Sequence, residues 1–180
     1  MGKKFIGSAA LTPSSDSGFD LDTKGQIHGY TSTQYALDVG NDSDILVCDS
    51  GEASGLKYTA NTTSFILACS DETTAISDTG TVLTFYMPFD YTVTAVRASL
   101  TTTSSSGTPT IDISEDGTSI MTTTKITIDP GDLISTESAA QPVVTDSALA
   151  DEAKITIDVD VTGTDATGLK VYIIGYRVAH

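Results

Sequence analysis

The carboxylates of this sequence are the residues whose types and spacing could do chemistry. Asp158 and Asp160 are two residues apart in an alternating segment, so a strand there places both on one face, about 7 Å apart. Asp112 lies on a similar outward face of another predicted strand. Such oxygens could bind calcium, but the D-x-[DN]-x-[DN]-G loop of a calcium site is missing. We therefore interpret these aspartates as the solvated polar face of a sheet and predict no metal and no cofactor.

Motifs for nucleophilic or phosphate chemistry are also missing. His28, in GQIHGY, has no G-x-S-x-G serine or cysteine partner nearby, and the only other histidine is His180. The sequence contains no phosphate-binding Gly-Lys-Ser/Thr loop, no dinucleotide fingerprint and no zinc-ligand spacing. We predict no catalytic residues and no enzymatic activity.

Tyrosines offer a different function, because a saccharide-binding face usually carries aromatic platforms. Four of the seven tyrosines lie in predicted strands or at their ends: Tyr86, Tyr91, Tyr172 and Tyr176. Their spacing suits core or subunit-contact residues equally well, and that is the interpretation we favour.

Strands must position these side chains. Roughly a quarter of the residues are Ser or Thr, Trp is absent, and no window has the apolar stripe of an amphipathic helix. The predicted fold class is all-β, with an extended N-terminal arm and a jelly-roll-like antiparallel β-sandwich knob. Composition changes near residue 60, so we predict the arm, with short strand-like anchors, over residues 1–60 and the knob over residues 61–180.

The knob segments differ in their apolar pattern. Residues 64–70 and 169–178 are apolar on both faces, which predicts two central strands. Residues 154–161 alternate, which predicts a half-buried strand with these side chains inward: Ile155, Ile157, Val159 and Val161.

Turn chemistry marks the ends of several strands. Residues 87–90 separate two predicted strands, with Pro88 and Asp90 as turn residues. Asp116-Gly117 predicts a type I′ hairpin turn, and Pro130-Gly131 suits the centre of a type II turn.

Charge and cysteine content limit the possible partners. The 24 acidic residues against 9 basic ones repel nucleic-acid phosphates and anionic membranes, so we predict no nucleic acid and no membrane partner. No apolar run reaches membrane-spanning length. Cys48 and Cys69 do not form a disulfide framework, and we predict both as small buried apolar residues of a protein made in a reducing cytosol.

The arm is rich in turn-forming residues and has no sustained alternation, so disorder is one interpretation. Apolar and aromatic residues recur in it, however, as they would in a segment that becomes ordered on a partner. The predicted partner-binding anchors are Phe5, Ile6, Leu11, Phe19, Leu21, Ile27, Tyr30, Tyr35 and Leu37.

Four motifs of the first sixty residues resemble a stretch common in structural proteins of tailed bacteriophages. That stretch reads K-G-[DQ]-[LI], then L-x-V-G-x-D, then [VI]-L-x-x-D-S, and finally G-L-K-[WY]. The matching segments are residues 24–27, 37–42, 45–50 and 55–58, with Tyr58 where Trp is usual. The rest of the chain is similar to a β-rich domain often seen at the C-terminal end of phage tail-fibre and virion proteins.

The resemblance implies a structural component of a phage virion, assembled in the host cytoplasm and located on the virion surface. We favour a capsid decoration (cement) protein, whose arm docks on the major capsid protein or other virion subunits and whose knob projects as a homotrimer. The alternative is a short tail or head fibre whose knob binds a host-surface glycan. A phage-associated glycan hydrolase is the remote third hypothesis, since no acid/base pair has a convincing context.

Overall fold

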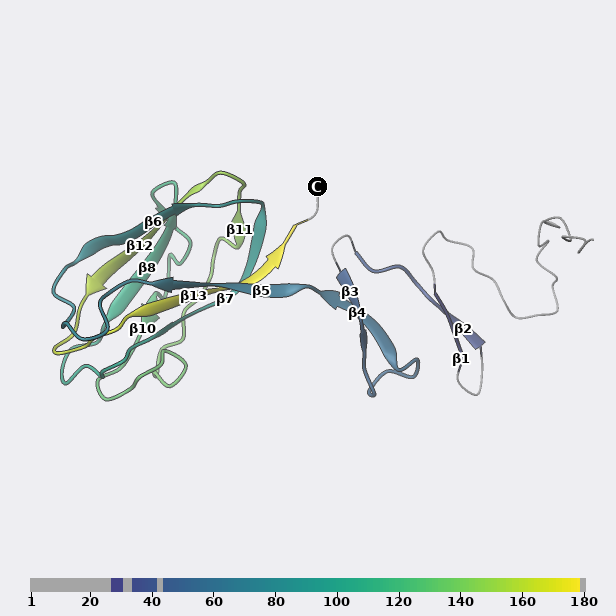
Figure 1. The fold of residues 1–180 in the computed structure, drawn as a ribbon, viewed down its shortest axis with the longest axis horizontal. Coiled ribbons are helices and arrows are strands. Elements are labelled where there is room, and N and C mark those ends of the chain that lie inside the picture. The colour runs from purple at the N-terminus through teal and green to yellow at the C-terminus, as the bar shows by residue number, and fades with distance from the viewer. Residues whose placement is uncertain (1–26, 31–33, 42–43, 179–180) are drawn as a thin grey trace, which may run out of the picture. The chain divides into compact units, whose positions relative to one another are not determined.

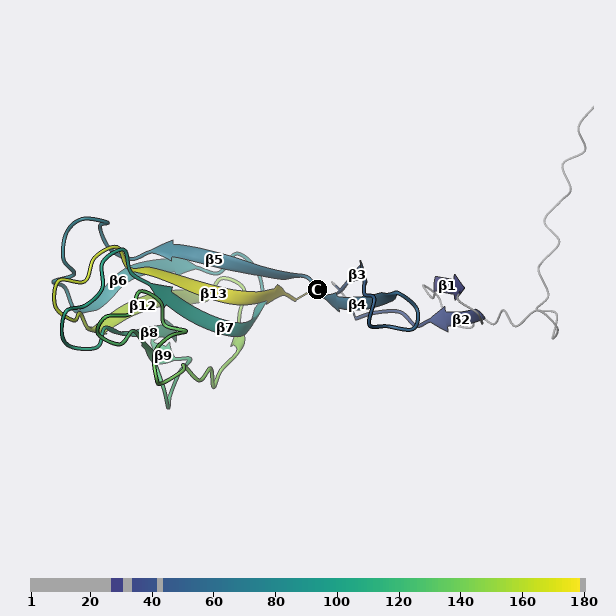
Figure 2. The ribbon, with the colours of Figure 1, turned by 90° about the horizontal axis from the view of Figure 1, so that it is seen from below.

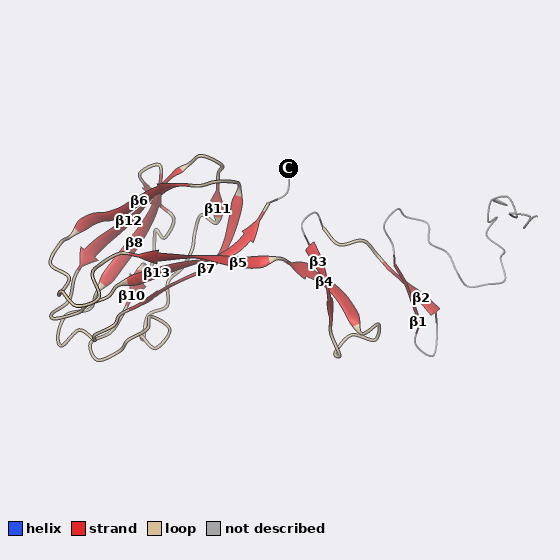
Figure 3. Ribbon diagram, in the orientation of Figure 1, coloured by secondary structure: helices blue, strands red, loops and turns tan. Residues whose placement is uncertain are grey.

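The computed structural model describes residues 27–30, 34–41 and 44–178, and these residues fold as antiparallel β-structure with no helix (Figures 1 and 3). The predicted all-β class is confirmed. The described residues therefore contain no helix that could cross a membrane. The chain divides into two compact units, residues 1–60 and residues 61–180.

Two hairpins make up the described part of the first unit. Strands β1 (Ile27–Tyr30) and β2 (Gln34–Leu37) form one, and β3 (Asp44–Cys48) and β4 (Leu56–Ala60) form the other. Each is a two-stranded sheet with no third strand among the described residues. A two-stranded hairpin is marginally stable in water, because it has no second layer to cover its apolar side chains.

The second unit is a β-sandwich of two sheets. Its strands are β5 (Thr62–Ala68), β6 (Gly80–Tyr86), β7 (Tyr91–Ser99), β8 (Thr110–Glu115), β9 (Thr118–Ser119), β10 (Ile126–Thr127), β11 (Ala148–Leu149), β12 (Lys154–Val161) and β13 (Lys170–Arg177). One sheet has the order β11-β7-β13-β5 and the other β10-β8-β12-β6, with β9 paired to β8. Figure 2 shows β5, β13 and β7 side by side in one layer.

The pairing is nested: β5 pairs with β13, β6 with β12, β7 with β11, and β8 with β10. The predicted sandwich is confirmed, and the jelly-roll arrangement stays a prediction, because β10 and β11 have two residues each.

The core lies between the two sheets and is built from alternate residues of the strands. Ile155, Ile157 and Val159 of β12 are at most 1% exposed, as the alternation predicted. The prediction that Val161 points inward is wrong. Val161 is 45% exposed, because β12 ends there and the other sheet no longer covers it.

Two segments that are apolar on both faces were predicted to be central strands, and the prediction is correct for one of them. β13 lies between β7 and β5 and is central, as predicted. β5, which covers most of residues 64–70, was predicted central and is an edge strand. Its outward residue Ile66 is 63% exposed, so the described residues do not bury the second apolar face of this strand.

The predicted turns are present. Asp116 and Gly117 have φ angles of 48° and 85°, as a type I′ turn requires, and they join β8 to β9. Gly131 has a φ of 95°, and the Asp132 N–H donates to the Asp129 carbonyl at 3.0 Å, which closes the Pro130-Gly131 turn.

The break at residues 87–90 sends the chain from one sheet to the other, since β6 and β7 belong to different layers. Beside it, Phe65, Phe85, Phe89 and Tyr91 form an aromatic cluster with ring centroids 5.2–6.3 Å apart. Tyr91 is 1% exposed and its hydroxyl donates to the Thr63 carbonyl at 2.9 Å. Tyr91 is therefore a core residue and no saccharide platform.

Candidate functional site

The β3–β4 hairpin and the residues before it carry apolar side chains that the chain leaves exposed. Not one described residue from 37 to 60 is buried. Val39, Ile45 and Leu46 are 46%, 42% and 39% exposed. Ile45 and Leu46 are neighbours on one strand, so they point to opposite faces, and both faces of the hairpin are partly apolar.

The loop between β3 and β4 is shaped by Asp49. Its side chain accepts a hydrogen bond from the Gly51 N–H at 2.8 Å and forms an ion pair with Lys57. The hydrogen bond from Lys57 lowers the pKa of Asp49 below its usual value, and the same contact raises the pKa of Lys57. Gly55 closes the loop with a φ of 70°, a conformation that favours glycine.

Gly40 lies against the ring of Tyr58. A Cβ at residue 40 would lie 2.6 Å from Cγ of Tyr58, closer than real Cβ contacts allow. Three of the four virion-like motif segments thus meet in this hairpin: residue 40 contacts residue 58, and residue 49 pairs with residue 57. Contacts among these three segments shape one hairpin, and its apolar residues Val39, Ile45 and Leu46 remain partly exposed.

The predicted anchors are only partly within the described residues. Ile27 of β1 and Leu37 of β2 are cross-strand partners and half-buried. The backbones of Tyr30 and Tyr35 lie in the same two strands, but their side chains are outside what the structure describes. The other five anchors lie outside the described residues: Phe5, Ile6, Leu11, Phe19 and Leu21. Val39, Ile45 and Leu46 were not predicted as anchors, although their apolar type in a turn-rich segment was a usable signal.

The outer face of the β5–β13–β7 sheet is a second exposed apolar surface. Ile66, Tyr172 and Arg97 form one cross-strand row over the three strands. A groove of about 210 Å³ lies on this face, between Tyr172 and Ile174 of β13, Arg97 of β7 and the exposed Ile134. We name this surface, with Ile66, the apolar sheet face.

Arg97 has no ion pair within the described part of the chain. It is exposed on a sandwich that carries 16 acidic residues against 5 basic ones. The sequence predicted neither Arg97 nor Ile66 as functional, because only strand order places them in one row.

The three aspartates that were predicted to form a solvated face, Asp112, Asp158 and Asp160, differ in their surroundings. Asp112, expected to be solvated, is 7% exposed, so that part of the prediction is wrong. Its Oδ1 accepts two hydrogen bonds, from the Ser119 hydroxyl at 2.6 Å and from the backbone N–H of Ile113 at 2.8 Å. Its Oδ2 forms an ion pair with Lys125 Nζ at 2.9 Å. The carboxylate is buried because Ser119 of β9 and Lys125, next to β10, lie against it along the edge of β8.

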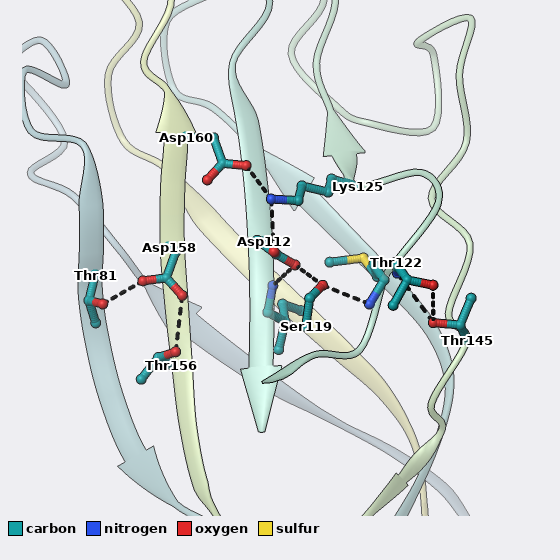
Figure 4. Close-up of polar contacts among 11 residues, drawn as sticks. Thr81, Asp112, Ser119, Thr122, Lys125, Thr145, Thr156, Asp158 and Asp160 are labelled. Carbon is teal, nitrogen blue, oxygen red and sulfur yellow. Dashed lines mark hydrogen bonds and ion pairs between the residues drawn. The ribbon is translucent and has the colours of Figure 1, made fainter. Parts of the chain in front are cut away.

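Lys125 lies between two carboxylates (Figure 4). Its Nζ also contacts Oδ2 of Asp160 at 2.6 Å. Hydrogen bonds to Asp160 and Asp112 raise the pKa of Lys125 to about 12. The ammonium group supplies the positive charge that these two carboxylates need, which makes this cluster a structural ion-pair network.

Asp158 is the cross-strand partner of Asp112, but its carboxylate contacts hydroxyl groups of β6 and β12. It accepts hydrogen bonds from Thr81 and, at 3.0 Å, from Thr156 (Figure 4). In the described ranges no three His, Cys, Asp or Glu side chains are arranged to hold a metal ion.

The two cysteines are free thiols in different environments. Cys69 is buried as predicted, and burial raises the pKa of its thiol to about 11. Cys48 is exposed, so the prediction that it is buried is wrong. It lies in the β3–β4 hairpin, which no second layer of described residues covers.

Compared with protein-family models, curated proteins and solved structures, the chain has no match.

Proposed function

We propose that this protein is a structural component of a phage virion, and specifically a capsid decoration protein. In this role the first sixty residues dock on the major capsid protein or another virion subunit, and the sandwich projects from the virion surface as a homotrimer. The role requires no catalysis.

One observation carries the proposal: the hairpin formed by the virion-like motifs has no buried residue and exposes Val39, Ile45 and Leu46. An element of this kind becomes stable when a partner covers its apolar side chains. The net charge of −15 suits a protein present at high local density, because it resists self-aggregation.

The test is attachment of the full-length protein to phage particles that lack it. Val39→Ser, Ile45→Ser and Leu46→Ser are expected to weaken attachment, by at least about tenfold for the strongest variant. Val143→Ser is the matched control, because Val143 is 46% exposed, as Val39 is, but belongs to the sandwich. Attachment that is unchanged in all three hairpin variants contradicts the proposal. Copy number in purified virions then separates a decoration protein, with hundreds per particle, from a fibre.

The apolar sheet face is our candidate for the contact between copies. Tyr and Arg are enriched among interface hot spots, and here they share one cross-strand row with the exposed Ile66. Arg97, which forms no ion pair with the residues that the structure describes, favours a second copy of this acidic chain as the partner, because the copy offers carboxylates to this cation. The edge strand β5 also has no charged residue and no proline, the usual protections of a free edge.

Light scattering tests the trimer. The wild type is expected at three times the 18.7 kDa chain mass, and Ile66→Asp and Arg97→Glu are expected to lower the mass toward one chain. A monomeric wild type at all concentrations contradicts the trimer but leaves the docking proposal intact.

The second candidate is a short tail or head fibre with a glycan-binding knob. The observation that favours it is Tyr86, which is 65% exposed on the polar outer face of the β8–β12–β6 sheet.

A further inference from the structure

The outer face of the β8–β12–β6 sheet has a hollow of about 470 Å³ with no apolar side chain in its lining. The hollow lies over three adjacent strands and the turn after β8. Its side chains are hydroxyls, carboxylates and one ammonium group: Thr81, Ser114, Asp116, Lys154, Thr156 and Asp158. A polar hollow on a rigid sheet differs from the apolar groove of the other sheet, and it suits a ligand rich in hydroxyl groups.

Asp158 is held in place at the hollow by two neighbouring hydroxyls. Thr81 donates to its Oδ1 and Thr156 to its Oδ2, so the carboxylate is fixed and each oxygen retains a lone pair (Figure 4). Because both donors lie on paired strands, the acceptor is preorganised before any ligand binds.

Lys154 supplies the donors. Its backbone N–H donates to Oδ1 of Asp116 at 3.0 Å, and the Asp116 N–H donates back to the Lys154 carbonyl at 2.8 Å, which fixes the turn against β12. Its ammonium group has no ion pair within the described residues.

Tyr86 stands next to the hollow. It is the cross-strand partner of Lys154, so the two side chains share a face. Its ring is 65% exposed and makes no hydrogen bond or ring contact with the part of the chain that the structure describes. An exposed ring with a polar tip is a platform for a ligand that has one apolar face and many hydroxyls.

We propose that this hollow binds a neutral oligosaccharide, with one sugar ring stacked on Tyr86 and hydroxyls of the next ring paired with Asp158 and Lys154. Sugar hydroxyls both donate and accept, which matches a fixed carboxylate and an ammonium group that line one hollow. Acidic sugars and nucleic acids are disfavoured, since Asp116 and Asp158 line the hollow and the whole sandwich is acidic. The inference rests on the second of the two proposed functions and does not depend on how the first sixty residues dock.

The experiment is binding of the full-length protein to an array of neutral oligosaccharides of glucose, galactose, mannose and N-acetylglucosamine, with sialylated and uronic-acid glycans alongside. Affinity for the strongest neutral glycan is then measured by calorimetry. Tyr86→Ala and Asp158→Ala are expected to lower it at least about tenfold, whereas Tyr86→Phe, which keeps the ring, stays within about threefold. Val161→Ala is the control, because Val161 is 45% exposed on the same strand as Asp158 but does not line the hollow.

Three results would overturn the inference: no neutral glycan bound by the wild type, a preference for the acidic glycans, or unchanged affinity in Tyr86→Ala. Tyr86 is exposed, so its variants keep the fold and decide the question even if Asp158→Ala is unstable. Attachment to phage particles, measured on the same variants, is expected to be unchanged. Failure of glycan binding and failure of docking can therefore be told apart.

Discussion

The β3–β4 hairpin and the sandwich contain the same kinds of side chain in opposite environments. Ile157 in the sandwich is fully buried, whereas Ile45 in the hairpin is 42% exposed. The sandwich has two sheets that cover each other, and the hairpin has one layer of two strands. Burial of an apolar side chain needs a second layer, and none of the described residues provides one for the hairpin.

Charged residues follow the same division. Asp112 in the sandwich is buried and satisfied by Lys125, a hydroxyl and a backbone N–H. Asp49 in the hairpin shapes a loop through Lys57 and one backbone N–H. We expect the contacts of Asp112 to contribute to the stability of the sandwich and those of Asp49 to contribute only to the local shape of its loop. The comparison shows that the sandwich buries a core of its own, whereas the described hairpin leaves its apolar side chains partly exposed.

The largest expected effect separates the core of the sandwich from the exposed apolar residues of the hairpin. Ile157→Ala removes a fully buried side chain and is expected to reduce the free energy of unfolding of the sandwich by about 2–5 kcal/mol. Leu46→Ala is expected to leave the sandwich unchanged, because Leu46 lies in the hairpin and is 39% exposed. Urea denaturation measures both, and equal losses would contradict the division into two units.

The modification rates of the two cysteines compare the hairpin with the sandwich in the unmutated protein. Cys69 is expected to react with iodoacetamide at least about a hundredfold more slowly than Cys48 at pH 8, because burial hides its thiol and raises the pKa to about 11. Mass spectrometry of the modified protein over time gives both rates. In urea the two rates should converge, and equal rates in the native protein would break the comparison.

A smaller effect is expected from the two aspartates. Asp112→Ala leaves Lys125 with one partner and buries unpaired donors, and we expect a loss of about 2 kcal/mol in the stability of the sandwich. Asp49→Ala should leave the melting temperature of the sandwich unchanged. Thermal melts of the two variants are compared, and a large shift for Asp49→Ala would show that the hairpin shares the sandwich's cooperative transition.

The smallest effect depends on pH. The pKa of Lys125 is raised from 10.5 to about 12 in the folded protein, so its stabilising contribution is complete below about pH 10 and is lost as the pH rises through 12. Lys125 is 36% exposed, and we expect a contribution of no more than about 1 kcal/mol. The stability difference between wild type and Lys125→Met should therefore shrink from pH 8 to pH 11.5. A difference that grows over this range would contradict the sign.

Much of the fold could be predicted, because it depends on neighbours in the chain. The alternation of β12 and the Asp116-Gly117 turn arise from the geometry of a strand and the φ angles that Asp and Gly accept. The edge position of β5 could not be predicted, because the apolar pattern of a segment does not determine whether one strand or two pair with it. The virion-like motifs were visible, but not that Gly40 and Tyr58 form one contact.

By itself, the sequence determined the β class, the turns and the change of composition near residue 60, because these follow from local propensity and spacing. Only the tertiary structure decided which polar and apolar side chains stay in contact with water. Contacts with Ser119 and Lys125 buried Asp112, the edge position of β5 exposed Ile66, and the single layer of the hairpin exposed Cys48. Exposure depends on the layers that other parts of the chain provide, and those parts are distant in sequence.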